Sequence, residues 1–339
     1  MTKFTRITAP FIALGLFLAS GLLYASQVLA ADISTYGLRG LKGQDDRILV
    51  EASEYPWSAI GRFNKRTGGH CTAALVADNV AITSAHCLWN KRTYRYLGPE
   101  SVVFVGGWNR GEFIAASEAD RILISSKYDG KAPPRLKNVI HDWAIVILKE
   151  PVGQKVGTVG VTSLDAKRLR ALNKQKTVFV QAGYSTDKKH VITAHVGCFL
   201  QGWVEGVDVI QHQCDAVPGD SGSPVFMIHK GKVSVIALHA ATGKIRGTVR
   251  GFAVPIARFA KGLKELGVKG AAPPADGSLK PLRTTLGLMS LLGRNISNDP
   301  EGALRSFQTE VGLPATGIAD HATHAAALVA LGRKVGFFP

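Results

Sequence analysis

Short apolar runs separated by turn residues dominate the chain from about residue 46 to residue 254. β-Branched residues are frequent in these runs, and Gly, Asn, Asp and Lys mark the turns. Many short strands without long helical patterns between them are typical of an all-β barrel or sandwich. We expect strands at 58–63, 72–76, 80–83, 101–105, 143–148, 177–182 and 233–238.

The periodicity changes after Val254, where residues 255–266 space their apolar side chains as a helix does. A stretch rich in Gly, Pro and Ala follows at 270–278 and has the composition of a linker. Three further helices are predicted at about 286–292, 301–311 and 322–331. The predicted domains are therefore a β-rich domain at 46–267, a linker at 268–283 and a small three-helix domain at 284–339.

The N-terminus has the anatomy of a secretory signal peptide at residues 1–30. Lys3 and Arg6 precede an apolar stretch at about 11–24, and Val28-Leu-Ala30 supplies a small-x-small cleavage site. The alternative is an uncleaved membrane anchor, but the stretch is short for a span and no second candidate follows. We expect a secreted or periplasmic, cell-envelope protein with no stable membrane span, beginning with an N-terminal segment at 31–45.

Composition fits a folded globular protein, since 46% of residues are hydrophobic and 19% are charged. The formal net charge of +16 would attract the protein to anionic polymers, or it serves solubility alone. Lys and Arg are spread along the chain, and no motif of a nucleic-acid-binding fold is present. Nucleic acid is therefore excluded as the expected partner.

Four cysteines form two close pairs that lie far apart, Cys71 with Cys87 and Cys198 with Cys214. Four cysteines allow three disulfide connectivities, of which local pairing would close two short loops. There is no Cys-x-x-Cys motif and no tight Cys/His cluster, so the sequence predicts no metal site and no cofactor.

Three segments carry residue types that together suit nucleophilic catalysis: Thr83-Ser-Ala-His-Cys87, His141-Asp-Trp-Ala-Ile-Val146 and Pro218-Gly-Asp-Ser-Gly-Ser-Pro224. A serine hydroxyl is a weak nucleophile at neutral pH unless a base takes its proton. Imidazole can accept that proton and return it to a leaving group, and a carboxylate can orient the imidazole. The candidates are Ser221 as nucleophile, His86 as base and Asp142 as orienting group.

These segments resemble the trypsin/chymotrypsin family over about residues 46–266. The resemblance implies a mainly β, two-barrel chymotrypsin-like domain that cleaves protein or peptide substrates through an acyl-enzyme on Ser221. It also implies an oxyanion hole made by the backbone N–H groups of Gly219 and Ser221. Glycine at 219 suits an unusual backbone conformation, and Pro218 has no N–H to donate. The alternative is a catalytically inactive, protease-like binding protein of the envelope.

Two details are more similar to the bacterial glutamyl-endopeptidase branch: Ser223 in place of a second glycine, and the run Val235-Ile-Ala-Leu-His239. The family resemblance implies a Cys71–Cys87 disulfide beside His86. A Cys198–Cys214 disulfide would resemble the bacterial branch.

The resemblance leaves the substrate preference open between two residues. Asp215 lies six residues before Ser221, where trypsin-like enzymes select Arg or Lys. His239 lies where the glutamyl-endopeptidase branch receives an acidic side chain. Either residue could instead be structural. Activation is open as well, because Arg47-Ile48 resembles a trypsin-type activation bond whose new amino group would pair with Asp220, or it lies within the mature N-terminal segment.

The C-terminal stretch resembles the small helical peptidoglycan-binding domain through Phe307-Gln308, Gly312-Leu313 and Thr316-Gly317. The resemblance implies peptidoglycan as a partner and a tether to the cell wall, and the alternative is a helical domain that only packs or solubilises. His321 and His324 have helical spacing but lack a third metal ligand, so we expect both to face solvent.

Overall fold

The computed structural model describes residues 40–204, 206–245 and 247–336, and all of them belong to one compact unit. The predicted signal peptide and most of the segment at 31–45 lie outside the described residues. Within the described part of the chain, no helix is long and apolar enough to cross a membrane.

Six strands close into a barrel in the order β2-β3-β4-β9-β8-β7. Strand β9 (Ala144–Leu148) shows why this sequence forms a barrel wall. Val146 and Leu148 point into the core of the barrel, whereas Ile145 joins the core outside it, so the strand is apolar on both faces. The other strands are β2 (Ile60–Lys65), β3 (His70–Ala77), β4 (Val80–Thr83), β7 (Val102–Gly106) and β8 (Ala115–Ile124).

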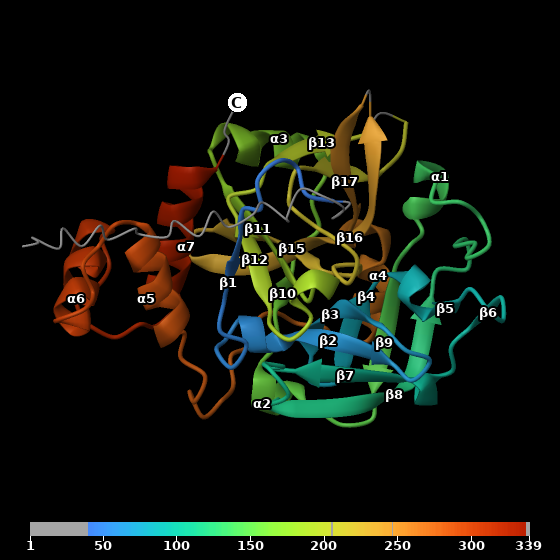
Figure 1. Ribbon diagram of the computed structural model, residues 1–339, viewed down its shortest axis with the longest axis horizontal. Coiled ribbons are helices and arrows are strands. Elements are labelled where there is room, and N and C mark those ends of the chain that lie inside the picture. Colours follow the sequence, from blue (N-terminus) through green and yellow to red (C-terminus); the bar gives the residue numbers. More distant parts are fainter. Residues whose placement is uncertain (1–39, 205, 246, 337–339) are drawn as a thin grey trace, which may run out of the picture. The chain divides into compact units, whose positions relative to one another are not determined.

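A second, nine-stranded sheet follows the order β1-β12-β11-β15-β16-β17-β14-β13, with β10 paired to β16 (Figure 1). Its interior faces share one hydrophobic core with the outer face of the barrel. The strands are β1 (Arg47–Leu49), β10 (Gly160–Val161), β11 (Val178–Gly183), β12 (Thr193–Val196), β13 (Leu200–Trp203), β14 (Ile210–His212), β15 (Pro224–His229), β16 (Lys232–Ile245) and β17 (Thr248–Pro255).

Short helices and one small ribbon connect these strands. The helix predicted at 255–266 is interrupted at Phe259, between a 3-10 turn (Ile256–Arg258) and α4 (Ala260–Glu265). The remaining elements are β5 (Trp89–Asn90), β6 (Arg95–Tyr96), α1 (Leu136–Val139), α2 (Gly153–Val156), α3 (Ala166–Lys174) and 3-10 turns at Trp57–Ala59, Ala85–Leu88, Pro99–Ser101 and Thr186–Lys188.

Three helices follow at the C-terminus, α5 (Leu282–Leu291), α6 (Pro300–Glu310) and α7 (His321–Val335). Helix α7 contacts β11, β12 and β16 of the second sheet, and α5 packs against α7 (Figure 1). Leu288, Phe307 and Leu328 join the same core as Trp57. The carboxylate of Glu54 also accepts the first backbone N–H groups of α5, at 2.6 and 2.9 Å. The helices therefore pack as part of the protein body.

The predicted linker is held in place at two points. Ala272 forms a bridge with Thr158, and the backbone N–H of Tyr55 donates to the carbonyl of Leu279 at 3.0 Å. Backbone hydrogen bonds therefore fix both halves of this stretch to the rest of the protein. The domain boundaries at 267 and 284 stay predictions.

Candidate active site

His86 and Asp142 come together because they lie at the ends of paired strands. His86 follows β4 and Asp142 precedes β9, and Thr83 of β4 pairs with Ala144 of β9. One carboxylate oxygen of Asp142 lies 2.6 Å from Nδ1 of His86, and the other accepts the His86 backbone N–H at 2.8 Å. Asp142 is buried whereas the His86 side chain is partly exposed. A carboxylate at Nδ1 makes that nitrogen the donor and leaves the Nε2 lone pair free.

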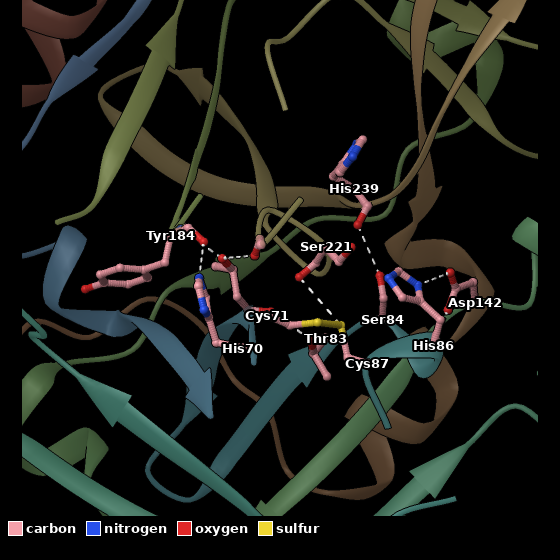
Figure 2. Close-up of a disulfide and its surroundings, with 12 residues drawn as sticks. His70, Cys71, Thr83, Ser84, His86, Cys87, Asp142, Tyr184, Ser221 and His239 are labelled. Atoms are coloured by element: carbon pink, nitrogen blue, oxygen red, sulfur yellow. Dashed lines mark hydrogen bonds and ion pairs between the residues drawn. A yellow bond between two sulfur atoms is a disulfide. The ribbon is translucent and has the colours of Figure 1, made fainter. Parts of the chain in front are cut away.

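Ser221 lies in the loop between β14 and β15, and this loop is hydrogen-bonded to both the barrel and the second sheet. Its carbonyl accepts the backbone N–H of Thr72 in the barrel at 2.9 Å, and the next residue donates to the carbonyl of His239 in β16 at 2.8 Å. The hydroxyl of Ser84 donates to the same carbonyl at 3.1 Å. Figure 2 shows Ser221, Ser84 and His86 around this point. Within the described residues the Ser221 hydroxyl makes no hydrogen bond to His86, and such bonds often tighten only with substrate.

The disulfide Cys71–Cys87 joins β3 to the residue that follows His86 (Figure 2). The second disulfide, Cys198–Cys214, braces the chain that leads to Ser221. Both predicted pairings are confirmed. Each joins residues 16 positions apart, which restricts the unfolded chain and favours the folded state.

Residues 217–221, called here the oxyanion loop, adopt the backbone that Gly219 allows. Its φ is 97°, and a Cβ atom there would lie 2.5 Å from the carbonyl oxygen of Tyr184. Only glycine fits both conditions without a shift. Within the described residues, the N–H groups of Gly219 and Ser221 donate no hydrogen bond. Both are therefore free to bind a substrate oxyanion.

Asp215 is hydrogen-bonded to the N-terminal segment. Its carboxylate accepts the backbone N–H groups of Lys42 at 2.7 Å and Asp46 at 3.1 Å, and His195 lies 3.3 Å away. Burial would raise the pKa of Asp215, but the hydrogen bond from His195 and the backbone donors lower it below its usual value. These contacts favour the structural alternative for Asp215.

His239 belongs to a hydrogen-bonded chain that also contains His212. The backbone N–H of Cys214 donates to Nδ1 of His212 at 3.2 Å, so the proton of neutral His212 is on Nε2. That Nε2–H points to Nδ1 of His239 at 3.0 Å, which leaves the proton of His239 on its own Nε2. Burial lowers the pKa of both rings well below the usual value, so both are neutral at pH 7. The chain presents Nε2–H of His239 as a donor.

Two residues near this histidine pair were not predicted from sequence: His212 and Lys42. The ammonium of Lys42 donates to the carbonyls of Cys214 at 2.5 Å and Gly40 at 2.6 Å. Burial lowers its pKa to about 8, even though the carboxylate of Asp215 opposes that change. The only sequence signal for His212 is its place two residues before Cys214.

A cavity of about 260 Å³ adjoins the catalytic pair, and His86 and Asp142 form part of its wall. Trp89, Tyr128 and residues 240–242 of β16 also line this cavity. A cavity beside the base and along a strand is suited to the side chains of an extended peptide.

Among the residues that the structure describes, two clusters bring together residue types that can bind metal. In one, Cys71 and Cys87 are joined as a disulfide and offer no thiolate beside His86. In the other, Asp46, His195 and Asp215 place ligand atoms within 4.8 Å of one another. The oxygens of Asp215 already accept backbone N–H groups there, so this cluster is explained by hydrogen bonding.

Comparison with known proteins assigns both the sequence and the fold of this chain to the same class of protein. The trypsin family model matches residues 49–263, more than half of the chain. The chain belongs to the trypsin family of serine proteases. This trypsin-family chain has a mainly β, chymotrypsin-like fold, as expected, with helices added at its C-terminus. A solved glutamyl endopeptidase superimposes with a TM-score of 0.53 at 20% identity, covering 68% of this chain and all of that one.

Among curated relatives, a glutamyl endopeptidase of Bacillus licheniformis is 26% identical over 195 residues, which is 56% of each chain. Serine protease 23 of Rattus norvegicus is 27% identical over 208 residues, 56% of this chain and 51% of that one. The human form matches over the same lengths. The chain thus spans about half the length of the curated relatives it matches.

Of the residues that resemble a peptidoglycan-binding domain, Phe307 and Gln308 lie inside α6, and the others lie in the loop between α6 and α7. Phe307 is buried, and the Gln308 amide donates to the carbonyl of Ile318 and the hydroxyl of Thr323 at 2.9 Å each. The Gln308 side-chain oxygen accepts the N–H of Gly317 at 2.8 Å. These residues hold the helices together, and the family match ends before them.

His324 does not face solvent as predicted. It is 1% exposed, its Nδ1 lies 3.0 Å from the hydroxyl of Thr285, and its ring packs edge-on to Trp57. Helical spacing showed that His321 and His324 share a face, but it could not show that this face packs against the protease body.

Proposed function

We propose that this chain is an exported serine endopeptidase that hydrolyses peptide bonds through an acyl-enzyme on Ser221. Nε2 of His86 takes the hydroxyl proton as Oγ forms a bond to the substrate carbonyl carbon. The carbonyl electron pair moves to oxygen, which accepts the N–H groups of Gly219 and Ser221. The C–N bond then breaks and His86 protonates the leaving amine. Water attacks the acyl-enzyme by the same route and regenerates Ser221.

The His86–Asp142 pair carries this proposal. A buried carboxylate that binds both the ring and the backbone N–H of one histidine fixes the ring's tautomer and position. Two unpaired backbone N–H groups in the oxyanion loop supply donors for the oxyanion of the tetrahedral intermediate. An inactive binding protein would have no need for this combination.

The same site supports a preference for an acidic residue before the cleaved bond. Nε2–H of His239 is a donor whose orientation is set by His212, and the Lys42 ammonium adds a positive charge nearby. Asp215, the group that would favour Arg or Lys, is engaged by backbone donors. A carboxylate side chain suits this donor better than a cation does. The relative named glutamyl endopeptidase agrees with this preference.

A fluorophosphonate probe tests the catalytic proposal, because Ser221 Oγ would bond to phosphorus while fluoride leaves and His86 takes the proton. Intact-mass analysis should show one adduct in the wild type and none in Ser221→Ala. Ser223→Ala is the matched control, since this buried serine in the same motif should not be labelled. His86→Ala should slow turnover by about four orders of magnitude. A folded wild type without any adduct would instead identify the inactive binding protein.

Export and attachment to the cell wall are further parts of the proposal. Two disulfides fit an oxidising compartment outside the cytoplasm. Attachment to peptidoglycan rests on the resemblance of residues 303–320 and on the net charge of +16, which attracts anionic polymers.

A further inference from the structure

Asp220 folds the oxyanion loop from inside the protein. Its carboxylate oxygen Oδ2 accepts the backbone N–H of Val217 at 2.9 Å, and its backbone N–H donates to the carbonyl of Val217 at 3.0 Å. This pair of bonds closes the turn that presents the N–H groups of Gly219 and Ser221. Any side chain that stabilises the charge on Asp220 therefore also stabilises this turn and the position of the two oxyanion-hole N–H groups.

The described residues include no ion-pair partner within 4.0 Å of Asp220, although the residue is 2% exposed. Its Oδ2 instead accepts the hydroxyl of Ser185 at 2.8 Å. Burial raises the pKa of Asp220 to about 6, and hydrogen bonds and the more distant charge of Arg47 act in the opposite direction. Burying a carboxylate without a charged partner costs free energy of folding. The group that polarises the Ser185 hydroxyl therefore helps to stabilise the charge on Asp220.

Ser185 is in turn the acceptor for Arg47, whose Nη1 donates to the Ser185 hydroxyl at 2.8 Å. The guanidinium is almost fully buried between Asp45 and Asp187, which it meets at 2.7 Å each. Arg47 itself lies in β1, where it pairs with His195 of β12. The guanidinium thus donates to the hydroxyl and the hydroxyl to the carboxylate of Asp220, which also accepts the loop N–H of Val217.

We infer that Arg47, acting through Ser185, is a positioning residue that holds Asp220 and with it the oxyanion loop in the uncut chain. This inference rests on the proposed function of the same site. It also gives the Arg47-Ile48 bond a different role from trypsin-type activation. Cleavage there would free the strand end that carries Arg47, so an intact bond keeps the loop assembled.

Ser185→Ala is the sharpest test, because it removes one hydroxyl and leaves the Arg47 cluster in place. Saturation kinetics with the fluorophosphonate probe separate the labelling rate constant kinact from the probe's apparent KI. We expect kinact to fall about 10- to 100-fold, while KI changes less than about threefold, since the loop acts on the transition state. Ser58→Ala is the matched control, since Ser58 is equally buried and its hydroxyl makes one hydrogen bond, to the carbonyl of Val156 in α2.

A second variant, Arg47→Lys, tests the same inference if the Ser185→Ala protein does not fold. It keeps a cation beside Asp45 and Asp187 but shortens the reach to Ser185, so kinact should again fall by at least about fivefold. Wild-type kinact in either folded variant, or an equal fall in Ser58→Ala, would overturn the inference. A wild type that never reacts would refute the proposed function instead, so the two failures are distinguishable.

Discussion

Gly332 offers a direct test of whether the C-terminal helices belong to the protease body. This residue lies inside α7, where a Cβ atom would come within 2.4 Å of Cγ1 of Val178 in β11. Its backbone is also close to β12, because a Cβ atom at Gly197 would lie 2.7 Å from the Gly332 carbonyl. The helix backbone therefore rests directly on the sheet, with no room for one methyl group.

Gly332→Ala should destabilise the whole protein. Val178 is β-branched and buried, so it cannot move aside easily, and overpacking of this kind costs about 1–3 kcal/mol. Replacing a helix-interior glycine returns roughly 0.5–1 kcal/mol of helix propensity. The expected net loss in the free energy of unfolding is about 1–2 kcal/mol.

Gly287→Ala is the matched control within α5. No atom lies within 4 Å of the Cβ position there, so this variant should gain roughly 0.5–1 kcal/mol from helix propensity alone. Urea unfolding, followed by tryptophan fluorescence and far-UV circular dichroism, measures both variants. Opposite signs are expected, together with one cooperative transition. Equal stabilisation by both substitutions, or separate melting of the helices, would refute docking and favour an independent tethered domain.

Two further predictions concern histidines. His239→Ala or His212→Ala should lower the preference for Glu over Gln before the cleaved bond by about tenfold or more in kcat/KM, and a wild type that favours Arg, Lys or apolar residues would contradict the acidic preference. Burial lowers the pKa of His324 to about 3, so below about pH 6.5 only the unfolded chain takes up this proton. The free energy of unfolding should therefore fall by about 2 kcal/mol from pH 7 to pH 5 on account of this histidine. Urea unfolding measures that loss, and the loss should be absent in His324→Phe.

The β-rich half of the fold follows from local pattern, because each strand alternates or repeats apolar residues over a length that one strand can bury. The predicted strand at 80–83 coincides with β4, and the one at 143–148 begins one residue before β9. Helix α3 was not predicted. Its buried face consists only of Leu169 and Leu172, and four of the other seven residues are Lys or Arg, so the apolar positions gave no clear period.

Long-range contacts set the limit for the candidate site. The motifs name His86, Asp142 and Ser221 because the chemistry itself restricts the residue types. The sequence offered Asp220 only a new amino group at Ile48 and offered Asp215 no partner, since Lys42 and Arg47 lie more than 170 positions away from these carboxylates. Docking of the helices depends equally on surfaces that meet only in the folded protein.

The residues before the barrel now acquire a role in the active site. The backbone N–H of Lys42 and the side chain of Arg47 serve the two acidic residues of the segment that leads to the nucleophile, Asp215 and Asp220. One contact is direct and the other passes through Ser185. Each carboxylate is buried, so withdrawal of residues 42–47 would leave both without these partners. The charge balance around Ser221 thus depends on a segment that lies outside the catalytic motifs and the barrel, and cleavage after Arg47 would free the strand end whose guanidinium donates to Ser185.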